Sequence, residues 1–289
     1  MKTLSYPIYF IFLSIFIAQD YIWPTNASNT ITAFFAEERP QRYHAGIDIR
    51  TYGKNGLEIY AIEDGYIEKI KTDYKGYGKT IYLKLEDGNT AVYAHLEKFY
   101  PELDQIAEIL KEEYNSSIIN HTFKKQEFTV KKGEIIGYTG DTGSISGPHL
   151  HFEIRNKDNI SINPLIDFYK IKDTIKPIPK KIAFIPMNYD TKINSNSDIK
   201  LYNIINGEND NEYFINDTIS VVGDFGISLS IIDKINKQPF SYGLYKIELY
   251  LDGELKYKIK YDKHNFNEGH IVNHERNYYL KRTENERFY

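Results

Sequence analysis

His149 and His151 are the residues of this sequence best suited to chemistry. They lie in Pro-His-Leu-His-Phe-Glu-Ile-Arg, where apolar and polar residues alternate from Leu150 onwards as they do in a half-buried strand. Side chains two apart on a strand point to the same face, so the two imidazoles are expected on one face, about 7 Å apart. Such a pair can bind a metal or exchange protons. The alternative is a surface strand that carries two solvated histidines.

His44 and Asp48 form a second pair, about a hundred residues earlier. Their spacing of four fits one face of a helix or of a strand, and the alternation of Ile47 and Ile49 with Asp48 favours a strand. His95 follows another strand-like run, Thr-Ala-Val-Tyr-Ala. We therefore expect these three polar residues at or beside the ends of strands.

Imidazole and carboxylate are zinc ligands, and catalytic zinc takes three protein ligands and leaves one position for water. Zinc makes such a water nucleophilic near neutral pH and polarises the carbonyl under attack. Three ligands from this set would leave two histidines for proton transfer or for stabilising the transition state. The residues thus indicate a metal-dependent hydrolase, but they do not show which three are ligands or what the substrate is.

The remaining histidines have no comparable setting. His121 follows a predicted helix in a polar stretch, and we expect it to be exposed. His264, His270 and His274 are loosely spaced, so we interpret them as surface residues in preference to a second metal cluster.

The composition narrows the chemistry further. Of the 289 residues, 41% are hydrophobic, which is enough for large cores, and the net charge of −4 argues against a nucleic-acid partner. The chain has no cysteine, which excludes disulfides, thiolate zinc sites, cysteine nucleophiles and a lipid anchor on cysteine. Any metal must be held by histidine and carboxylate.

The N-terminus has the features of an export signal. Residues 1–18 begin with Met-Lys-Thr and continue into an apolar run that ends in a small residue, which predicts a signal peptide. The alternative is a retained membrane anchor. We therefore expect an exported protein, located in the periplasm or cell envelope of a bacterium.

The elements that must position the polar residues are mainly strands. Residues 21–168 contain alternating runs separated by Asp-Gly turns, as at Asp64-Gly65 and Asp87-Gly88, which predicts an antiparallel β-sheet built from hairpins. An insertion at 100–127 interrupts them. Within it Leu103, Ile106, Ile109 and Leu110 recur at helical spacing, and a proline at 101 suits a first helical turn.

The second half predicts another β region. Residues 174–181, with two prolines and three lysines, read as a linker. Short strand-like runs with polar turns over 182–289 predict a β-sandwich of about immunoglobulin size. The tail from 265 does not resolve into elements, so an incomplete domain is one expectation.

Six motifs of the first region occur in the order typical of the lysostaphin-like, LytM-type zinc endopeptidases, peptidase family M23. They are His44-Ala45-Gly46-Ile47-Asp48, Ala61-x-x-Asp64-Gly65-x-Ile67, Tyr77-Gly78-Lys79-x-Ile81, Tyr93-Ala94-His95-Leu96, Lys132-Gly133-x-x-Ile136-Gly137-x-x-Gly140-x-Thr142-Gly143 and Gly147-Pro148-His149-Leu150-His151-Phe152-Glu153. The resemblance covers about residues 30–165 and implies a small antiparallel β-sheet with an open groove.

The resemblance also implies roles for the polar residues. It makes His44, Asp48 and His151 the ligands of one zinc ion, and His95 and His149 the catalytic histidines that position water and stabilise the oxyanion. It implies an exported zinc metalloendopeptidase that hydrolyses peptide cross-links or stems of bacterial peptidoglycan.

Several alternatives stay open. One is a catalytically inactive LytM-type regulator that activates another cell-wall hydrolase; such proteins usually lack a zinc ligand, whereas all five residues are present here. Another is a zinc peptidase that acts on proteins. The C-terminal region could bind an envelope partner, the insertion could line or cover the groove, and residues 21–42 could cover the metal.

Overall fold

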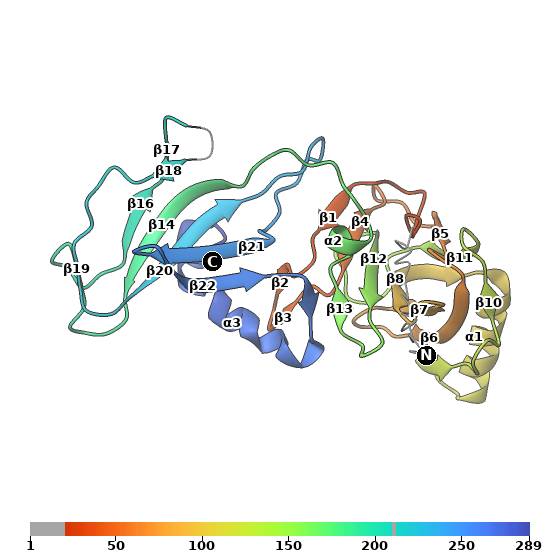
Figure 1. Ribbon diagram of the computed structural model, residues 1–289. Coiled ribbons are helices and arrows are strands. Elements are labelled where there is room, and N and C mark those ends of the chain that lie inside the picture. The colour runs from red at the N-terminus through yellow and green to blue at the C-terminus, as the bar shows by residue number, and fades with distance from the viewer. Residues whose placement is uncertain (1–20, 210–211) are drawn as a thin grey trace, which may run out of the picture.

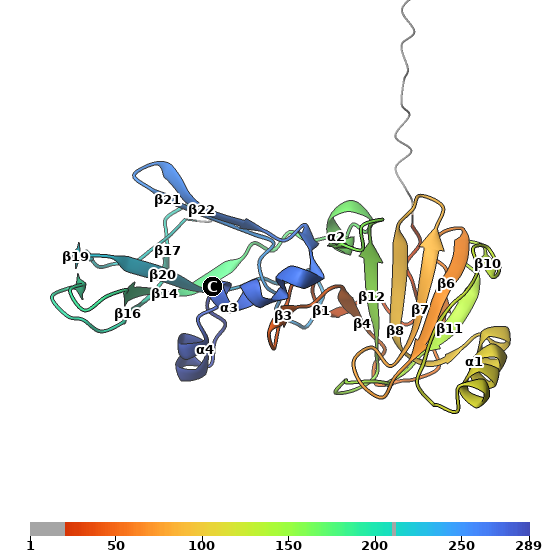
Figure 2. The same cartoon turned by 90° about the horizontal axis from the view of Figure 1, so that it is seen from below.

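The computed structural model describes residues 21–209 and 212–289, so the predicted signal peptide at 1–18 lies outside the described residues. Figures 1 and 2 show a sheet-rich part up to α2 (Pro164–Asp167) and an elongated part formed by the rest of the chain, lying end to end. Within the described residues, none of the helices has the length and apolar character needed to span a membrane.

The first part is an antiparallel sheet, as predicted. Its main path runs β1-β4-β12-β8-β7-β6-β10, and further strands pair at its margins. The path strands are β1 (Ile31–Ala33), β4 (Ile47–Arg50), β12 (His149–Arg155), β8 (Thr90–Phe99), β7 (Lys79–Leu85), β6 (Gly65–Thr72) and β10 (Thr129–Val130). The marginal strands are β5 (Glu58–Tyr60), β9 (Ile119–Thr122), β11 (Ile135–Thr139), β13 (Ser161–Ile162) and β23 (Lys263–His264).

The alternation read from the sequence places the core on one face of this sheet. Ile47 and Ile49 of β4 and Leu150 and Phe152 of β12 are fully buried and belong to one cluster. The polar residues between them point to the other face. The two strands that carry the predicted ligands are therefore anchored by their apolar faces.

The predicted helix is confirmed as α1 (Pro101–Glu113). It begins with proline, and Asp104 accepts a hydrogen bond from the backbone N–H of Phe99 at 3.0 Å. Leu103 is fully buried, whereas Ile109 is 61% exposed and does not join the core as its spacing suggested. Figure 2 shows α1 at the end of the sheet farthest from the C-terminal part.

The predicted linker at 174–181 is too long at its C-terminal end. Strand β14 (Ile178–Pro186) begins within it and pairs with β20 (Phe225–Ile232), from Ile178 opposite Ile232. Its second neighbour, β16 (Lys200–Asn203), pairs only from Lys181 onwards. Pro179 therefore stands where the strand has one neighbour, and a residue without an N–H is tolerated there.

The C-terminal part is mainly β, as predicted, with its strands divided among small sheets. Besides β16-β14-β20 these are the hairpins or pairs β15 (Lys192–Ile193) with β19 (Val221–Val222), β17 (Ile205–Asn206) with β18 (Tyr213–Phe214), and β21 (Lys246–Leu251) with β22 (Glu254–Lys260). The unassigned tail folds as η1 (Phe266–Ile271), α3 (Val272–Glu275) and α4 (Tyr278–Glu284). Leu280 of α4 packs with Ala183 and Phe288, so a helix, and not a second sheet, covers the three-stranded sheet.

The two parts are joined by more than the connecting chain. Strand β23 pairs with β13 and so extends the sheet of the first part. The Tyr242 hydroxyl donates to the carbonyl of Ile31 at 2.8 Å. Lys281 of α4 pairs at 2.7 Å with Glu38, in the hairpin formed by β2 (Glu38–Arg39) and β3 (Arg42–Tyr43). The C-terminal part therefore holds the segments that flank β4.

Candidate metal centre

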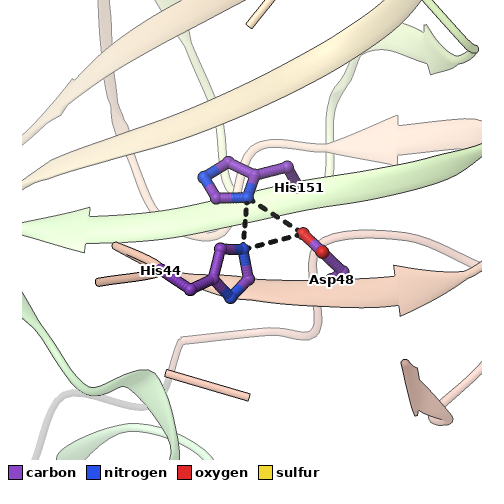
Figure 3. Close-up of side chains that lie close together, drawn as sticks. All are labelled: His44, Asp48 and His151. Carbon is purple, nitrogen blue, oxygen red and sulfur yellow. Dashed lines mark hydrogen bonds and ion pairs between the residues drawn. The ribbon is translucent and has the colours of Figure 1, made fainter. Parts of the chain in front are cut away.

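The structure brings His44, Asp48 and His151 together (Figure 3). Asp48 of β4 lies directly opposite His151 of β12, and His44 stands in the turn before β4. His44 Nε2 lies 3.0 Å from Asp48 Oδ1 and 2.9 Å from His151 Nδ1, and these last two atoms are 2.9 Å apart. All three residues are buried, with at most 6% exposed. Three potential ligand atoms therefore converge on one point.

The hydrogen bonds of the two imidazoles direct their lone pairs to that point. His44 Nδ1 lies 2.8 Å from the carbonyl oxygen of Phe34, and His151 Nε2 lies 2.7 Å from Glu153 Oε1. Both outer partners are acceptors, so these nitrogens carry the protons and the facing nitrogens are unprotonated in the neutral rings.

Three buried acceptor atoms this close require a cation between them. Tetrahedral zinc with bonds of about 2.0–2.1 Å separates its ligands by about 3.3 Å, so an opening of a few tenths of an ångström admits the ion. The donor set, two imidazoles and one carboxylate, suits zinc, and its outer hydrogen bonds are those a zinc ligand needs. The residues fit the metal.

In the metal-free protein a proton takes this place. Burial would lower the pKa of His151, but hydrogen bonds to Asp48 and Glu153 raise it to about 9. Burial likewise opposes ionisation of Asp48, yet the charge of His44 and hydrogen bonds from both histidines hold the pKa of Asp48 well below its usual value. Metal and proton thus compete for Nδ1 of His151.

A buried ion pair supports His151 from behind. Glu153 is fully buried and accepts from His151, from Arg155 Nε at 2.6 Å and from the hydroxyl of Tyr77. Burial raises its pKa, but the charges and hydrogen bonds of Arg155 and His151 together outweigh this and lower the pKa to about 2. Sequence reasoning assigned no role to Tyr77, Glu153 or Arg155, although alternation along β12 places 151, 153 and 155 on one face.

His95 and His149 lie beside the three converging residues. Their ring centroids are 4.9 Å apart, and His149 Nε2 is 3.5 Å from Asp48 Oδ1. His95 Nδ1 bonds the carbonyl of Thr142, and His149 Nδ1 that of Gly147, each at 2.9 Å. Burial, followed by the charges of His151 and His149, lowers the pKa of His95 to about 3. Both rings therefore have Nε2 as the nitrogen available for chemistry.

The backbone of His95 is strained. Its φ of +64° is a left-handed conformation that residues other than glycine rarely adopt. Such strain persists only where the surroundings enforce it, and it often marks a functional residue. The conformation lets His95 leave the alternation of β8 and join the polar face.

The converging residues lie in a groove of about 960 Å³. Beside the five site residues its lining includes Thr32, Ala33, Glu37, Arg39, Arg42, Tyr43, Ala45, Gly76, Tyr77, Gly143, Ser144, Ile145, Ser146, His264 and Phe266. The described residues of the insertion at 100–127 are not among them, so the insertion does not line this groove. A smaller lobe of about 400 Å³ adjoins it and shares Thr32, Ser146 and His149.

His264 was expected at the surface and is instead 6% exposed, with its ring against Tyr43 at 5.2 Å. Strand β23 places it there by pairing with β13, a long-range contact that local spacing does not reveal. With Phe266 it forms a wall of the groove from the C-terminal part. His121 is half-buried, and its ring lies 4.7 Å from Phe123.

The segment before β4 also reaches the centre. Arg39 of the β2–β3 hairpin lies with Nη2 3.1 Å from Asp48 Oδ2, the oxygen that does not face the histidines. One oxygen of Asp48 is thus held by a guanidinium while the other is left for a metal. Residues 21–42 therefore contact the centre, and the groove remains open beside them.

Comparisons with known proteins find relatives of the first part of the chain. The model of the family described as "Peptidase family M23" matches residues 42–114 and 109–164. The DD-carboxypeptidase/endopeptidase Mpg of Neisseria meningitidis is 32% identical over 114 residues, 39% of this chain and 20% of that protein. The murein hydrolase activator NlpD of Escherichia coli is 32% identical over 143 residues, 50% of this chain and 30% of that protein.

This chain spans less than a third of the length of either relative. Among solved structures, a zinc-containing peptidase from Vibrio cholerae is 22% identical, with a TM-score of 0.39 over 53% of this chain and 41% of that one.

Proposed function

Residues 42–164 belong to peptidase family M23, and from this premise we propose that the protein is an exported zinc metalloendopeptidase that hydrolyses peptide cross-links of bacterial peptidoglycan. One observation carries the proposal. Three buried ligand atoms lie within 3.0 Å of one another on the floor of an open groove, with two further histidines beside them.

His44, Asp48 and His151 would hold the ion, each by the atom that faces the other two. A bound zinc ion supplies Lewis-acid chemistry, which polarises a peptide carbonyl and makes water nucleophilic near neutral pH. The Arg39 guanidinium on the second oxygen of Asp48 favours coordination through one oxygen only.

His95 and His149 would manage protons. With Nδ1 bonded to a backbone carbonyl, each neutral ring presents an unprotonated Nε2. That nitrogen can accept a proton from the attacking water. The resulting imidazolium then donates a hydrogen bond to negative charge developing on the carbonyl oxygen, or a proton to the leaving amine.

The substrate class rests on the relatives and the groove. The matched relatives are named for carboxypeptidase and endopeptidase activity and for activation of murein hydrolases. The groove, of about 960 Å³, has room for part of a peptide chain beside the converging residues. Export to the envelope, expected from residues 1–18, would bring the protein to that substrate.

Substitutions of single histidines test the assignment. His151→Ala and Asp48→Ala should lose both zinc and hydrolysis of purified peptidoglycan. His95→Ala and His149→Ala should keep zinc and lose turnover, because they remove no ligand. His121→Ala, distant from the groove, is the matched control. Zinc is measured by elemental analysis, and released fragments by mass spectrometry. Digestion at the normal rate by the His151→Ala protein would contradict the proposal.

The second candidate is a regulator that binds and activates another wall hydrolase. The match to an activator over half of this chain favours it. The complete set of ligand and catalytic residues favours the enzyme, because a regulator does not need them. Protein that holds no zinc and releases no fragments by itself, but accelerates a partner hydrolase, would establish the regulator. A digest of denatured proteins tests the remaining alternative, a peptidase that acts on proteins.

A further inference from the structure

Arg50 lies beside the proposed catalytic residues without a carboxylate partner. It pairs with His149 in the β4–β12 register, two residues along from the pair Asp48 and His151. Residues two apart on a strand share a face, so Arg50 and Asp48 point to the same side of the sheet. The two cross-strand pairs are about 7 Å apart along the strands.

The side chain of Arg50 lines the smaller lobe of the groove, and none of the residues that line this lobe is acidic. The half-buried or buried arginines Arg39, Arg155, Arg276 and Arg287 each lie within ion-pair distance of a carboxylate. Among the residues that the structure describes, Arg50 has no such neighbour. A guanidinium keeps its charge in proteins, so this lobe has an uncompensated positive charge.

The guanidinium is held in place by aromatic rings. Its carbon lies 4.5 Å from the ring centre of Tyr52 and 5.4 Å from that of Phe240. Stacking of this kind fixes the plane and leaves the N–H groups at its edge for another ligand. Tyr52 adopts a left-handed φ of +54°, a conformation unfavourable for a tyrosine, in the turn that brings its ring back over Arg50.

The strand is also fixed relative to the catalytic histidine. The hydroxyl of Thr51, which is fully buried, donates to the carbonyl of Pro148 at 2.9 Å. Arg50 therefore stays at a set position beside His149. A planar fork of donors held in this way matches the two oxygens of a carboxylate.

We propose that Arg50 is a specificity residue that binds a carboxylate of the substrate, one or two residues from the peptide bond that is cleaved. The distance follows from the 7 Å offset, because an extended chain advances at most about 3.6 Å per residue. The inference rests on the proposed function, since it assumes cleavage beside His149. The carboxylate could be the C-terminal group of a peptide stem or an acidic side chain.

Matched peptides test the proposal on the full, zinc-loaded protein. Each is built around the bond that digestion of peptidoglycan identifies, or around a D-alanyl bond if none is cut. The two peptides of the first pair differ in having a C-terminal carboxylate or its amide next to that bond. The two peptides of the second pair differ in having an acidic side chain or its amide there. We expect a preference of about 10- to 100-fold in kcat/KM for the acid form of one pair, as one charge-assisted bidentate contact provides. The pair that shows it identifies the source.

Variants assign the preference to the side chain. Arg50→Gln should reduce the ratio of kcat/KM for the acid form to kcat/KM for the amide form to about one. Arg50→Lys should keep part of this preference. Arg282→Ala, at an exposed arginine of α4 that does not line either lobe, should keep the full ratio. Denaturation midpoints check that the variants fold. An equal rate for both forms in the wild type, or a preference that survives in Arg50→Gln, would overturn the proposal.

Calorimetric binding of the same peptides separates the two hypotheses. In one outcome the acid form binds more tightly, loses this advantage in Arg50→Gln and yet is not cleaved. That result would support the carboxylate site and refute the hypothesis that the protein is an enzyme. Cleavage of the peptides with equal binding of the acid and amide forms would support the peptidase and refute the carboxylate site.

Discussion

Replacing Glu153 by glutamine tests how the candidate metal centre is held together. In the wild type three donors, from His151, Tyr77 and Arg155, meet the two oxygens of one fully buried carboxylate. Glutamine offers one oxygen and two N–H groups, so at least one donor faces another donor, and the Arg155 cation loses its counter-charge.

Two effects of different size follow. Breaking a buried ion pair by neutralising one partner costs about 3–5 kcal/mol, so the free energy of unfolding of the metal-free protein should fall by about that amount. Loss of the anionic partner of a metal-binding imidazole weakens metal affinity about 10- to 100-fold. Denaturant titration measures the first effect, and competition with a chelator the second. Glu97→Gln, at an exposed glutamate of β8, is the control and should change neither.

A double variant separates the two effects. Glu153→Gln with Arg155→Met removes the stranded cation, while methionine can keep contact with the ring of Phe266, which lies 4.4 Å from the guanidinium. Stability should recover in part, because neither charge is then left unpaired. Metal affinity should stay low, because His151 still lacks its anionic acceptor. Recovery of both, or of neither, would refute the reasoning.

The pH dependence of Glu153→Gln gives a further check. The pKa of Glu153 lies at about 2 in the folded protein, below its unfolded value of 4.5. The stability that the carboxylate contributes is therefore complete above about pH 4.5 and is lost as the pH falls towards 2. The difference between wild type and Glu153→Gln should shrink over that interval. A constant difference would show that the carboxylate charge is not what the variant removes.

Three further outcomes are expected. The pKa of His151 in the metal-free protein is about 9, above its usual 6.5, so zinc must displace a proton from this ring. Competition with a chelator should therefore show an apparent zinc affinity that rises about tenfold per pH unit between pH 6.5 and 9. A flat profile would contradict a proton on His151. Gly78→Ala should destabilise by more than Gly76→Ala, at which only the cost of a left-handed alanine, roughly 1–2 kcal/mol, is expected. Of these two sites only Gly78 would place a Cβ against a backbone, 2.4 Å from the carbonyl carbon of Thr142; equal thermal shifts would refute this. Leu103→Ala in α1 should lower the free energy of unfolding by about 2–5 kcal/mol, because Leu103 is buried, whereas Ile109→Ala should change it little, because Ile109 is exposed. Denaturant titration measures both, and similar losses for the two variants would contradict this reasoning.

The antiparallel sheet and the shared faces of the site residues followed from period and parity. Alternation along β12 placed His149 and His151 on one face, and the apolar residues around Asp48 placed it on the matching face of β4. The register between these strands, which sets Asp48 opposite His151, depends on packing between residues about a hundred positions apart, and no local pattern fixes it. The resemblance in motif order supplied that step.

The supporting residues were harder to predict, because each acts through a long-range contact. Arg39 is one of several charges in an exposed-looking loop, and only the β2–β3 hairpin brings it to Asp48. Arg50 reads as the polar member of an alternating strand, and its lack of a partner is visible only in three dimensions. The helical tail failed to appear in the sequence because its segments are short, the longest being the 7 residues of α4, and they depend on packing against the sheet.

The C-terminal part supports the candidate metal centre through a chain of contacts. Phe266 lies against Arg155, Arg155 pairs with Glu153, and Glu153 holds His151. At the β2–β3 hairpin Lys281 pairs with Glu38, next to the arginine that holds Asp48. Both strand ligands are thus supported by residues that the C-terminal part contacts. A division of the chain near 174–181 would separate the proposed ligands from this support, so the C-terminal part belongs to the structure that holds the candidate site.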